Sequence, residues 1–254
     1  MLYLALSCFQ SRRMCDAAET LLSLAPGRIG LQLTAGCAPS PLTIDCPVRT
    51  HHGFTRRALR ATVWDEGKLV WNGDSVHPPR QKEVPDDWRP PEDVVLETMY
   101  PGYAALSNGD QIAQAMDEGR WLAVDIAHLD IQRFLGVMDD HVLRRLLDYK
   151  RLAEVHVSTS RESRDTHGKL SASTWGLEWA RDRLKAGTPV VLECYMHKLS
   201  HEERLEQVDW LLGSKLDSPA FSPLKTEPGR GLNPFSISTV KSAESWKCHI
   251  RLPS

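Results

Sequence analysis

Leu122-Ala123-Val124-Asp125 is the stretch that most clearly indicates the fold, because three apolar residues lead directly into a carboxylate. The same step recurs in residues 94–97 (Val-Val-Leu-Glu) and 190–193 (Val-Val-Leu-Glu), and Val155 directly precedes His156. Short continuous runs of Val, Leu and Ile are typical of parallel strands that are covered on both faces. These segments therefore predict a buried parallel sheet whose strands end in ionisable side chains.

Eight such apolar runs occur along the chain, and most are followed by a segment with helical periodicity. Eight strands that alternate with helices predict a (β/α)₈ TIM barrel, and 254 residues suit one such domain. We expect this barrel to occupy residues 1–213. The predicted strands are residues 2–7, 29–34, 47–53, 74–78, 94–100, 122–127, 153–158 and 190–195. The predicted helices are residues 12–24, 110–118, 131–149, 174–185 and 201–212, the last with Ser200 and Glu203 spaced for a capping box.

Two crossovers and the end of the chain lack a helical pattern. Residues between the third and fourth strands, and between the fourth and fifth, carry Trp64, Trp71, Pro79, Pro90 and Pro91 without sustained periodicity. We expect shortened crossovers after strands 3 and 4. Residues 214–254 are rich in Ser, Pro, Gly and Lys, and predict a poorly ordered or loosely packed tail.

The composition narrows the range of expected binding partners and locations. The formal net charge of −2 provides no global basic field, so binding to nucleic acid would need a local cationic patch. Six cysteines without a CxxC pair are typical of reduced thiols, which predicts a cytoplasmic protein. The apolar start is too short for a membrane span and has no basic residues, so we expect a buried strand there and no membrane contact.

A carboxylate in a buried strand is costly unless something compensates its charge. For one such residue, pairing with a neighbouring Arg or Lys is as good an explanation as a metal. Four at equivalent points of successive strands favour a shared divalent cation at the barrel mouth: Glu97, Asp125, His156 and Glu193. Asp125 and His128, and then Asp165 and His167, form two further acidic and imidazole pairs.

Over about residues 2–212, these strand-end motifs resemble the xylose isomerase-like TIM-barrel superfamily, which includes endonuclease IV, the ketose 3-epimerases and related sugar isomerases. In the isomerase and epimerase branch, one metal is held by Glu, Asp, His and Glu from four strands. The resemblance implies this role for Glu97, Asp125, His156 and Glu193.

The endonuclease IV branch holds three zinc ions, and its additional positions are similar to residues of this chain. Its early strand-end histidines resemble His51 in Thr50-His51-His52 and His77 in Val76-His77-Pro78. Adjacent strand residues face opposite sides, so only one of His51 and His52 is expected to serve. The nine ligands that the resemblance implies are His51, His77, Glu97, Asp125, His128, His156, Asp165, His167 and Glu193. After Glu97 the chain departs from the Gly-rich turn of endonuclease IV and reads Thr98-Met99-Tyr100.

Three reaction classes suit this ligand set. The first is hydrolysis of a phosphodiester or phosphate ester, in abasic DNA or a small phosphate, by water activated on one to three Zn²⁺ ions. The second is isomerisation or epimerisation of a sugar or cyclitol on one Mn²⁺, Co²⁺ or Mg²⁺, with Glu97 and Glu193 as acid and base. A multi-iron oxidative enzyme of natural-product biosynthesis is the third, and a non-enzymatic binding module is the alternative to all three.

Arginines near the predicted strand ends are candidate substrate ligands. Arg56 and Arg57 follow the His51-His52 pair, and Arg80 follows His77. They would bind the phosphate of a substrate beside the metals, or else form a solvated face at the barrel rim.

Overall fold

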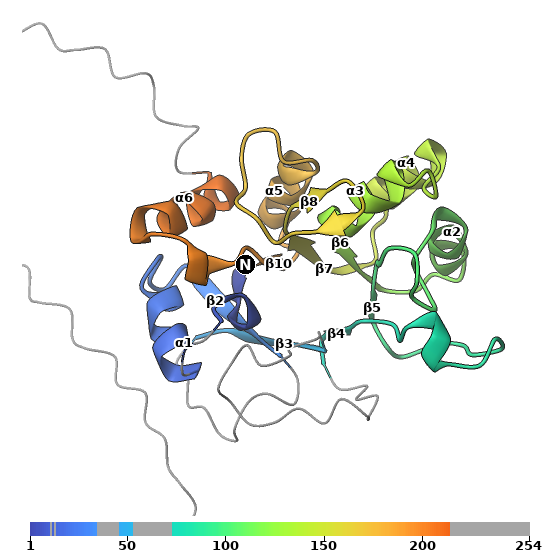
Figure 1. Ribbon diagram of the computed structural model, residues 1–254, viewed down its shortest axis with the longest axis horizontal. Helices are drawn as coiled ribbons and strands as arrows, with labels where there is room; N and C mark the ends of the chain where they lie inside the picture. Colours follow the sequence, from blue (N-terminus) through green and yellow to red (C-terminus); the bar gives the residue numbers. More distant parts are fainter. Residues whose placement is uncertain (11, 13, 35–45, 53–72, 214–254) are drawn as a thin grey trace, which may run out of the picture.

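The computed structural model describes residues 1–10, 12, 14–34, 46–52 and 73–213. Within these ranges eight parallel strands close into a barrel in the order β1-β10-β7-β6-β5-β4-β3-β2, and α-helices lie along part of its outer face (Figure 1). The strands are β1 (Leu2–Ala5), β2 (Ile29–Thr34), β3 (Val48–His52), β4 (Ser75–Val76), β5 (Leu96–Glu97), β6 (Leu122–Asp125), β7 (Leu152–Val157) and β10 (Val190–Leu192). The predicted α/β TIM-type barrel is therefore confirmed.

Parallel register brings the carboxyl ends of the strands to one rim. Asp125 on β6 lies opposite His156 on β7, and Glu97 on β5 lies opposite Ala123 on β6. The apolar residues that lead into these positions, such as Leu122, are buried, as their sequence pattern predicts. The barrel therefore presents the strand-end ionisable groups on the face where TIM barrels carry their active sites.

Helices cover part of the outside of the barrel. They are α1 (Met14–Leu22), α2 (Gly109–Asp117), α3 (Ile126–Phe134), α4 (Asp140–Asp148), α5 (Leu177–Lys185) and α6 (His201–Leu212). One apolar core lies beneath α1, α5 and α6, and a second lies beneath α2, α3 and α4. The predicted capping box at the start of α6 is present, because Ser200 accepts from Glu203 N and Glu203 accepts from Ser200 N. No helix among the described residues is both long and apolar enough to cross a membrane.

The single helix predicted for residues 131–149 is wrong, because two helices occupy this region. α3 ends near Phe134, Gly136 adopts a left-handed φ of 68°, and Asp139 caps α4 by accepting from His141 N and Val142 N. The apolar residues are similarly spaced on both sides of the break, so the periodicity alone predicted one continuous helix. α3 also begins at Ile126, inside the predicted strand 122–127, because Asp125 caps it.

The crossover after β4 contains only a short 3₁₀ helix, η2 (Gln81–Glu83), which confirms the shortened connection predicted there. The crossover after β3, residues 53–72, and the tail, residues 214–254, lie outside the described residues. Two further 3₁₀ helices, η1 (Leu6–Cys8) and η3 (Met196–Lys198), follow β1 and β10. A small antiparallel hairpin of β8 (Ser160–Arg161) and β9 (Arg164–Asp165), which the sequence did not predict, positions Asp165.

Candidate metal centre

Imidazoles and carboxylates converge at the carboxyl-terminal mouth of the barrel. The structure brings together all nine residues predicted as metal ligands, and each contacts at least one other member of the group: His51, His77, Glu97, Asp125, His128, His156, Asp165, His167 and Glu193. They come from five strands (β3, β5, β6, β7 and β9), from the first turn of α3, and from residues that follow β4, β9 and β10. Their separation in sequence and their closeness in space follow from barrel closure.

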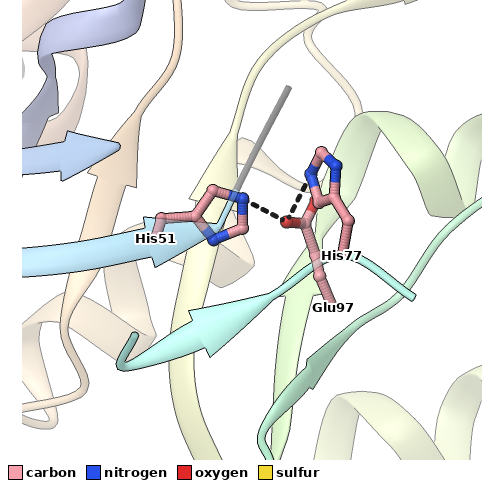
Figure 2. A group of neighbouring side chains, drawn as sticks. All are labelled: His51, His77 and Glu97. Carbon is pink, nitrogen blue, oxygen red and sulfur yellow. Dashed lines mark ion pairs between the residues drawn. The ribbon is translucent and has the colours of Figure 1, made fainter. Parts of the chain in front are cut away.

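Glu97 is fully buried at the centre of this group. Its Oε2 lies 3.2 Å from His51 Nε2 and 3.1 Å from His77 Nε2 (Figure 2). The same oxygen is 3.3 Å from His156 Nδ1, and Oε1 is 3.1 Å from His128 Nδ1. Neither carboxylate oxygen has a hydrogen-bond partner among the described residues. Two ligands bound tetrahedrally to zinc at about 2.0–2.1 Å lie about 3.3 Å apart, so the spacings around Oε2 suit ligands that share a cation.

A second group lies on the α3 side of Glu97. Asp165 Oδ2 is 2.8 Å from His167 Nε2 and 3.4 Å from His128 Nε2. Asp125 Oδ2 lies 4.0 Å from His128 Nε2 and is buried without a hydrogen-bond partner in the described part of the chain. Glu193 connects the two groups, because its Oε1 is 3.2 Å from His156 Nδ1 and its Oε2 is 3.9 Å from His167 Nδ1.

Backbone carbonyls fix the orientation of two histidines. His128 Nδ1 lies 2.8 Å from the Thr98 carbonyl, and His167 Nδ1 lies 2.6 Å from the Glu193 carbonyl. A carbonyl only accepts, so in both rings Nδ1 carries the hydrogen. The Nε2 atoms of both rings are then available to face Asp165, as in histidines that bind metals.

The pKa values of the group are strongly perturbed. Burial would raise the pKa of Glu97, but the charges of His156 and His77 hold it well below its ordinary value. Burial would lower the pKa of His156, but Glu97 and Glu193 raise it well above its ordinary value. Burial raises the pKa of Glu193, against the effect of His156. In the absence of cations, protons on the imidazoles therefore balance the carboxylate charge, and cations would compete with them.

The pKa values of Asp125 and Asp165 are shifted in opposite directions. Burial raises the pKa of Asp125, against the effect of His128. Burial would also raise the pKa of Asp165, but His128 and His167 hold it below its ordinary value. His51 shows the opposite balance, because burial lowers its pKa well below 6.5 despite the charge of Glu97.

Sequence reasoning missed Glu154. It is fully buried on β7, 2.8 Å from His156 Nε2, and its other oxygen accepts from Arg49 Nε at 2.5 Å. Burial would raise its pKa, but His156 and then Arg49 lower it to about 2. The available signal was the spacing Glu154-x-His156, since alternate strand residues share a face.

The structure describes only some of the remaining predicted residues. His51 lies in the pocket, whereas the side chain of its neighbour His52 is outside the description, as are Arg56 and Arg57. Arg80 stacks on the ring of Tyr103 at 3.9 Å, and the Tyr103 ring lies 6.3 Å from that of His77. Arg80 is therefore beside the pocket, at its rim.

No protein-family model and no curated protein matches this chain in sequence. The function is accordingly inferred from the side chains that the barrel brings together.

Proposed function

We propose that this chain is a metal-dependent hydrolase of phosphodiesters or phosphate esters, with at least two divalent cations in the pocket. The observation that carries this proposal is Glu97, a buried carboxylate whose two oxygens lack a hydrogen-bond partner among the described residues, with Oε2 facing His51, His77 and His156. A carboxylate with both oxygens free suits a bridging position between two ions. A single ion beside Oε2 would leave Oε1 buried without compensation.

Charge also favours more than one cation. Five carboxylates belong to the cluster, and Arg49 compensates one of them, Glu154. The other four are Glu97, Asp125, Asp165 and Glu193. With neutral imidazoles these four leave a charge that two divalent cations would balance. Zn²⁺ suits mixed imidazole and carboxylate ligands best, and Mn²⁺ and Fe²⁺ also accept them.

When bound, the cations would supply a Lewis acid for the phosphoryl oxygens and lower the pKa of water to near neutrality. The protein residues hold and orient this centre. His77 and His167, with side-chain exposures of 23% and 20%, are its most open members, so substrate would enter on their side. Arg80, stacked on Tyr103 near His77, places a guanidinium where a phosphate would approach.

A one-metal sugar isomerase is the second candidate, and one observation favours it. Glu97 and Glu193 lie on either side of His156 Nδ1, at 3.3 and 3.2 Å, as an acid and base pair beside one ion would. It requires only four of the nine residues and leaves no role for the other five, His51, His77, His128, Asp165 and His167. We therefore place hydrolysis first.

Metal content and activity separate the two candidates. After loading with Zn²⁺, we expect at least two ions per chain by elemental analysis, and cleavage of bis(p-nitrophenyl) phosphate. His77→Ala and His167→Ala should each lower the stoichiometry, because they remove ligands from different groups. His141→Ala, on the exposed face of α4, is the matched control and should match the wild type. One ion per chain together with interconversion of an aldose and a ketose would support the isomerase instead.

Abasic DNA is tested separately from small phosphate esters. A duplex that contains one abasic site is incubated with the zinc-loaded chain, alongside an undamaged duplex. Cleavage of the abasic duplex alone would identify DNA as the substrate. If only the small ester is cleaved, the substrate class is restricted to small phosphates.

A further inference from the structure

A second polar layer lies inside the barrel, one step closer to the amino ends of the strands than the predicted ligands. Arg49, Ser75 and Glu154 each come two residues before a pocket histidine, namely His51, His77 and His156. Gln32 on β2 pairs in register with Arg49 and belongs to the same layer. Barrel interiors are usually filled by branched apolar residues at such positions, so four polar side chains here require an explanation.

Glu154 is the centre of this layer. Its Oε1 accepts from Ser75 Oγ and lies 2.8 Å from His156 Nε2, and its Oε2 accepts from Arg49 Nε at 2.5 Å. Ser75 Oγ in turn lies 2.7 Å from His51 Nδ1. One buried carboxylate is therefore connected to two of the predicted ligands, directly to His156 and through Ser75 to His51.

His156 Nε2 lies 3.3 Å from Gln32 Nε2 but only 2.8 Å from Glu154 Oε1, and Glu154 is ionised by its pairing with Arg49. The closer, charged acceptor favours one assignment of the donors and acceptors in this network. Ionised Glu154 only accepts, so the single hydroxyl hydrogen of Ser75 is directed to it, and Ser75 Oγ must accept from His51 Nδ1. The lone pair of His51 then lies on Nε2, the atom that faces Glu97 at 3.2 Å. By the same reasoning His156 donates from Nε2 to Glu154, which leaves its Nδ1 lone pair toward Glu97 and Glu193.

Glu154 also differs from the carboxylates that we assign as ligands. Both of its oxygens have hydrogen-bond partners, whereas both oxygens of Glu97 and Oδ2 of Asp125 are buried without any in the described part of the chain. Although Glu154 lies near enough to His51 and His156 to form a candidate metal group with them, its bonding capacity is already used.

We propose that Glu154 is a positioning residue, which with Ser75 fixes the tautomer and ring orientation of His51 and His156 and thereby raises the affinity of the centre for metal. This inference rests on the proposed metal centre. Carboxylates that accept from the second nitrogen of a ligating histidine typically affect metal affinity about 10- to 100-fold. Here one carboxylate would act on two ligands that come from opposite sides of the barrel, β3 and β7.

The test is a Zn²⁺ titration of the full chain against a competing chelator, with Ser75→Ala and Glu154→Gln compared to the wild type. We expect both variants to bind Zn²⁺ about 10- to 100-fold more weakly at unchanged stoichiometry, because all ligands remain. Ser107→Ala is the matched control, a buried serine whose hydroxyl lies 3.0 Å from both the Tyr103 carbonyl oxygen and Gln111 Oε1, and it should keep wild-type affinity. Histidine ¹⁵N spectra of the zinc-loaded chain should show His51 protonated at Nδ1, and Ser75→Ala should lose this preference.

The possible outcomes separate the two proposals. Loss of one ion per chain in Glu154→Gln would show that Glu154 is itself a ligand and would overturn the inference. Ser75→Ala is the smaller change, and we expect it to fold even if Glu154→Gln does not. Unchanged Zn²⁺ affinity in Ser75→Ala would also overturn the inference, and the proposed function would still stand. A wild-type chain that binds neither Zn²⁺ nor Mn²⁺ would contradict both.

Discussion

Glu97 shows at the scale of one residue why this site suits a cation. A buried carboxylate that lacks hydrogen-bond donors is costly, and it persists only when an opposite charge compensates it. Protonated imidazoles supply that charge in the absence of metal, as the lowered pKa of Glu97 and the raised pKa of His156 indicate. A divalent cation would supply it with the imidazoles neutral, which is the form in which they bind metal.

Replacing Glu97 tests this directly. Glu97→Gln should reduce the metal stoichiometry by at least one ion, because the amide keeps the shape of the side chain and removes the bridging charge. The metal-free variant should lose stability at neutral pH, because the lowered pKa of Glu97 means that its ionised carboxylate, paired with protonated imidazoles, stabilises the fold. Elemental analysis and thermal unfolding measure the two effects. Glu203→Gln, an exposed carboxylate paired with Lys169, is the control, and full stoichiometry in Glu97→Gln would contradict the bridging role.

At the scale of secondary-structure elements, Asp125 has two roles. Its Oδ1 caps α3 by accepting from Ala127 N at 2.6 Å and His128 N at 3.0 Å, and its Oδ2 faces the pocket. β6 therefore ends, α3 begins and a predicted ligand is oriented at the same residue, Asp125. This explains why the predicted strand was too long and why His128 lies in the first turn of α3.

Two substitutions separate these roles. Asp125→Asn should keep the cap, because asparagine caps helices as well as aspartate, but should weaken metal binding. Asp125→Ala should weaken metal binding and in addition lower the free energy of unfolding of the metal-free chain by about 1 kcal/mol relative to Asp125→Asn. Urea unfolding and metal titration give the two values. Equal stability of the two variants would argue against the cap.

The break between α3 and α4 is testable at the same scale. Asp139→Ala removes the oxygen that accepts from His141 N and Val142 N, and should lower the free energy of unfolding by about 1 kcal/mol. Asp140→Ala, one residue later in the first turn, removes a charge but no cap, and should cost less. An unchanged urea midpoint in Asp139→Ala would show that the cap contributes nothing.

Barrel closure would couple a metal centre to the stability of the whole molecule. The predicted ligands come from β3, β5, β6, β7, β9, the first turn of α3 and the residues that follow β4, β9 and β10, so a bound cation would crosslink several strands of the barrel. Unfolding would separate them, and cations that bind only the folded chain would stabilise it.

Metal removal should therefore lower the thermal midpoint. At a free metal concentration of about 100 times Kd, each independent ion contributes about 2.7 kcal/mol, which for a chain of this size corresponds to a midpoint about 5–10 °C higher. Scanning calorimetry of the zinc-loaded chain, before and after dialysis against a chelator, measures the difference. Calcium, which prefers oxygen ligands, is the control cation and should produce a smaller shift. Identical thermal midpoints with and without zinc would contradict stabilisation of the folded chain by bound metal.

The barrel and seven of the nine predicted pocket residues were predictable from local patterns, whereas His51 and His77 were predicted from the family resemblance. Apolar runs such as Leu122-Ala123-Val124 indicate strands, and the ionisable residue after each run marks the rim where parallel strands end together. Asp125-x-x-His128 and Asp165-x-His167 are likewise short enough to be read without a fold.

Contacts across the barrel were decided only by the tertiary structure. Glu154 beside His156 reads in sequence as one charged residue in an apolar strand, and its meaning depends on Arg49 and Ser75, which lie 105 and 79 residues away. The register of separate strands determines which of these side chains meet, and no periodicity within one strand contains that information. The sequence by itself thus determined the strands, their order and the groups at their ends, whereas closure of the barrel decided which oxygens are satisfied and which remain for a cation.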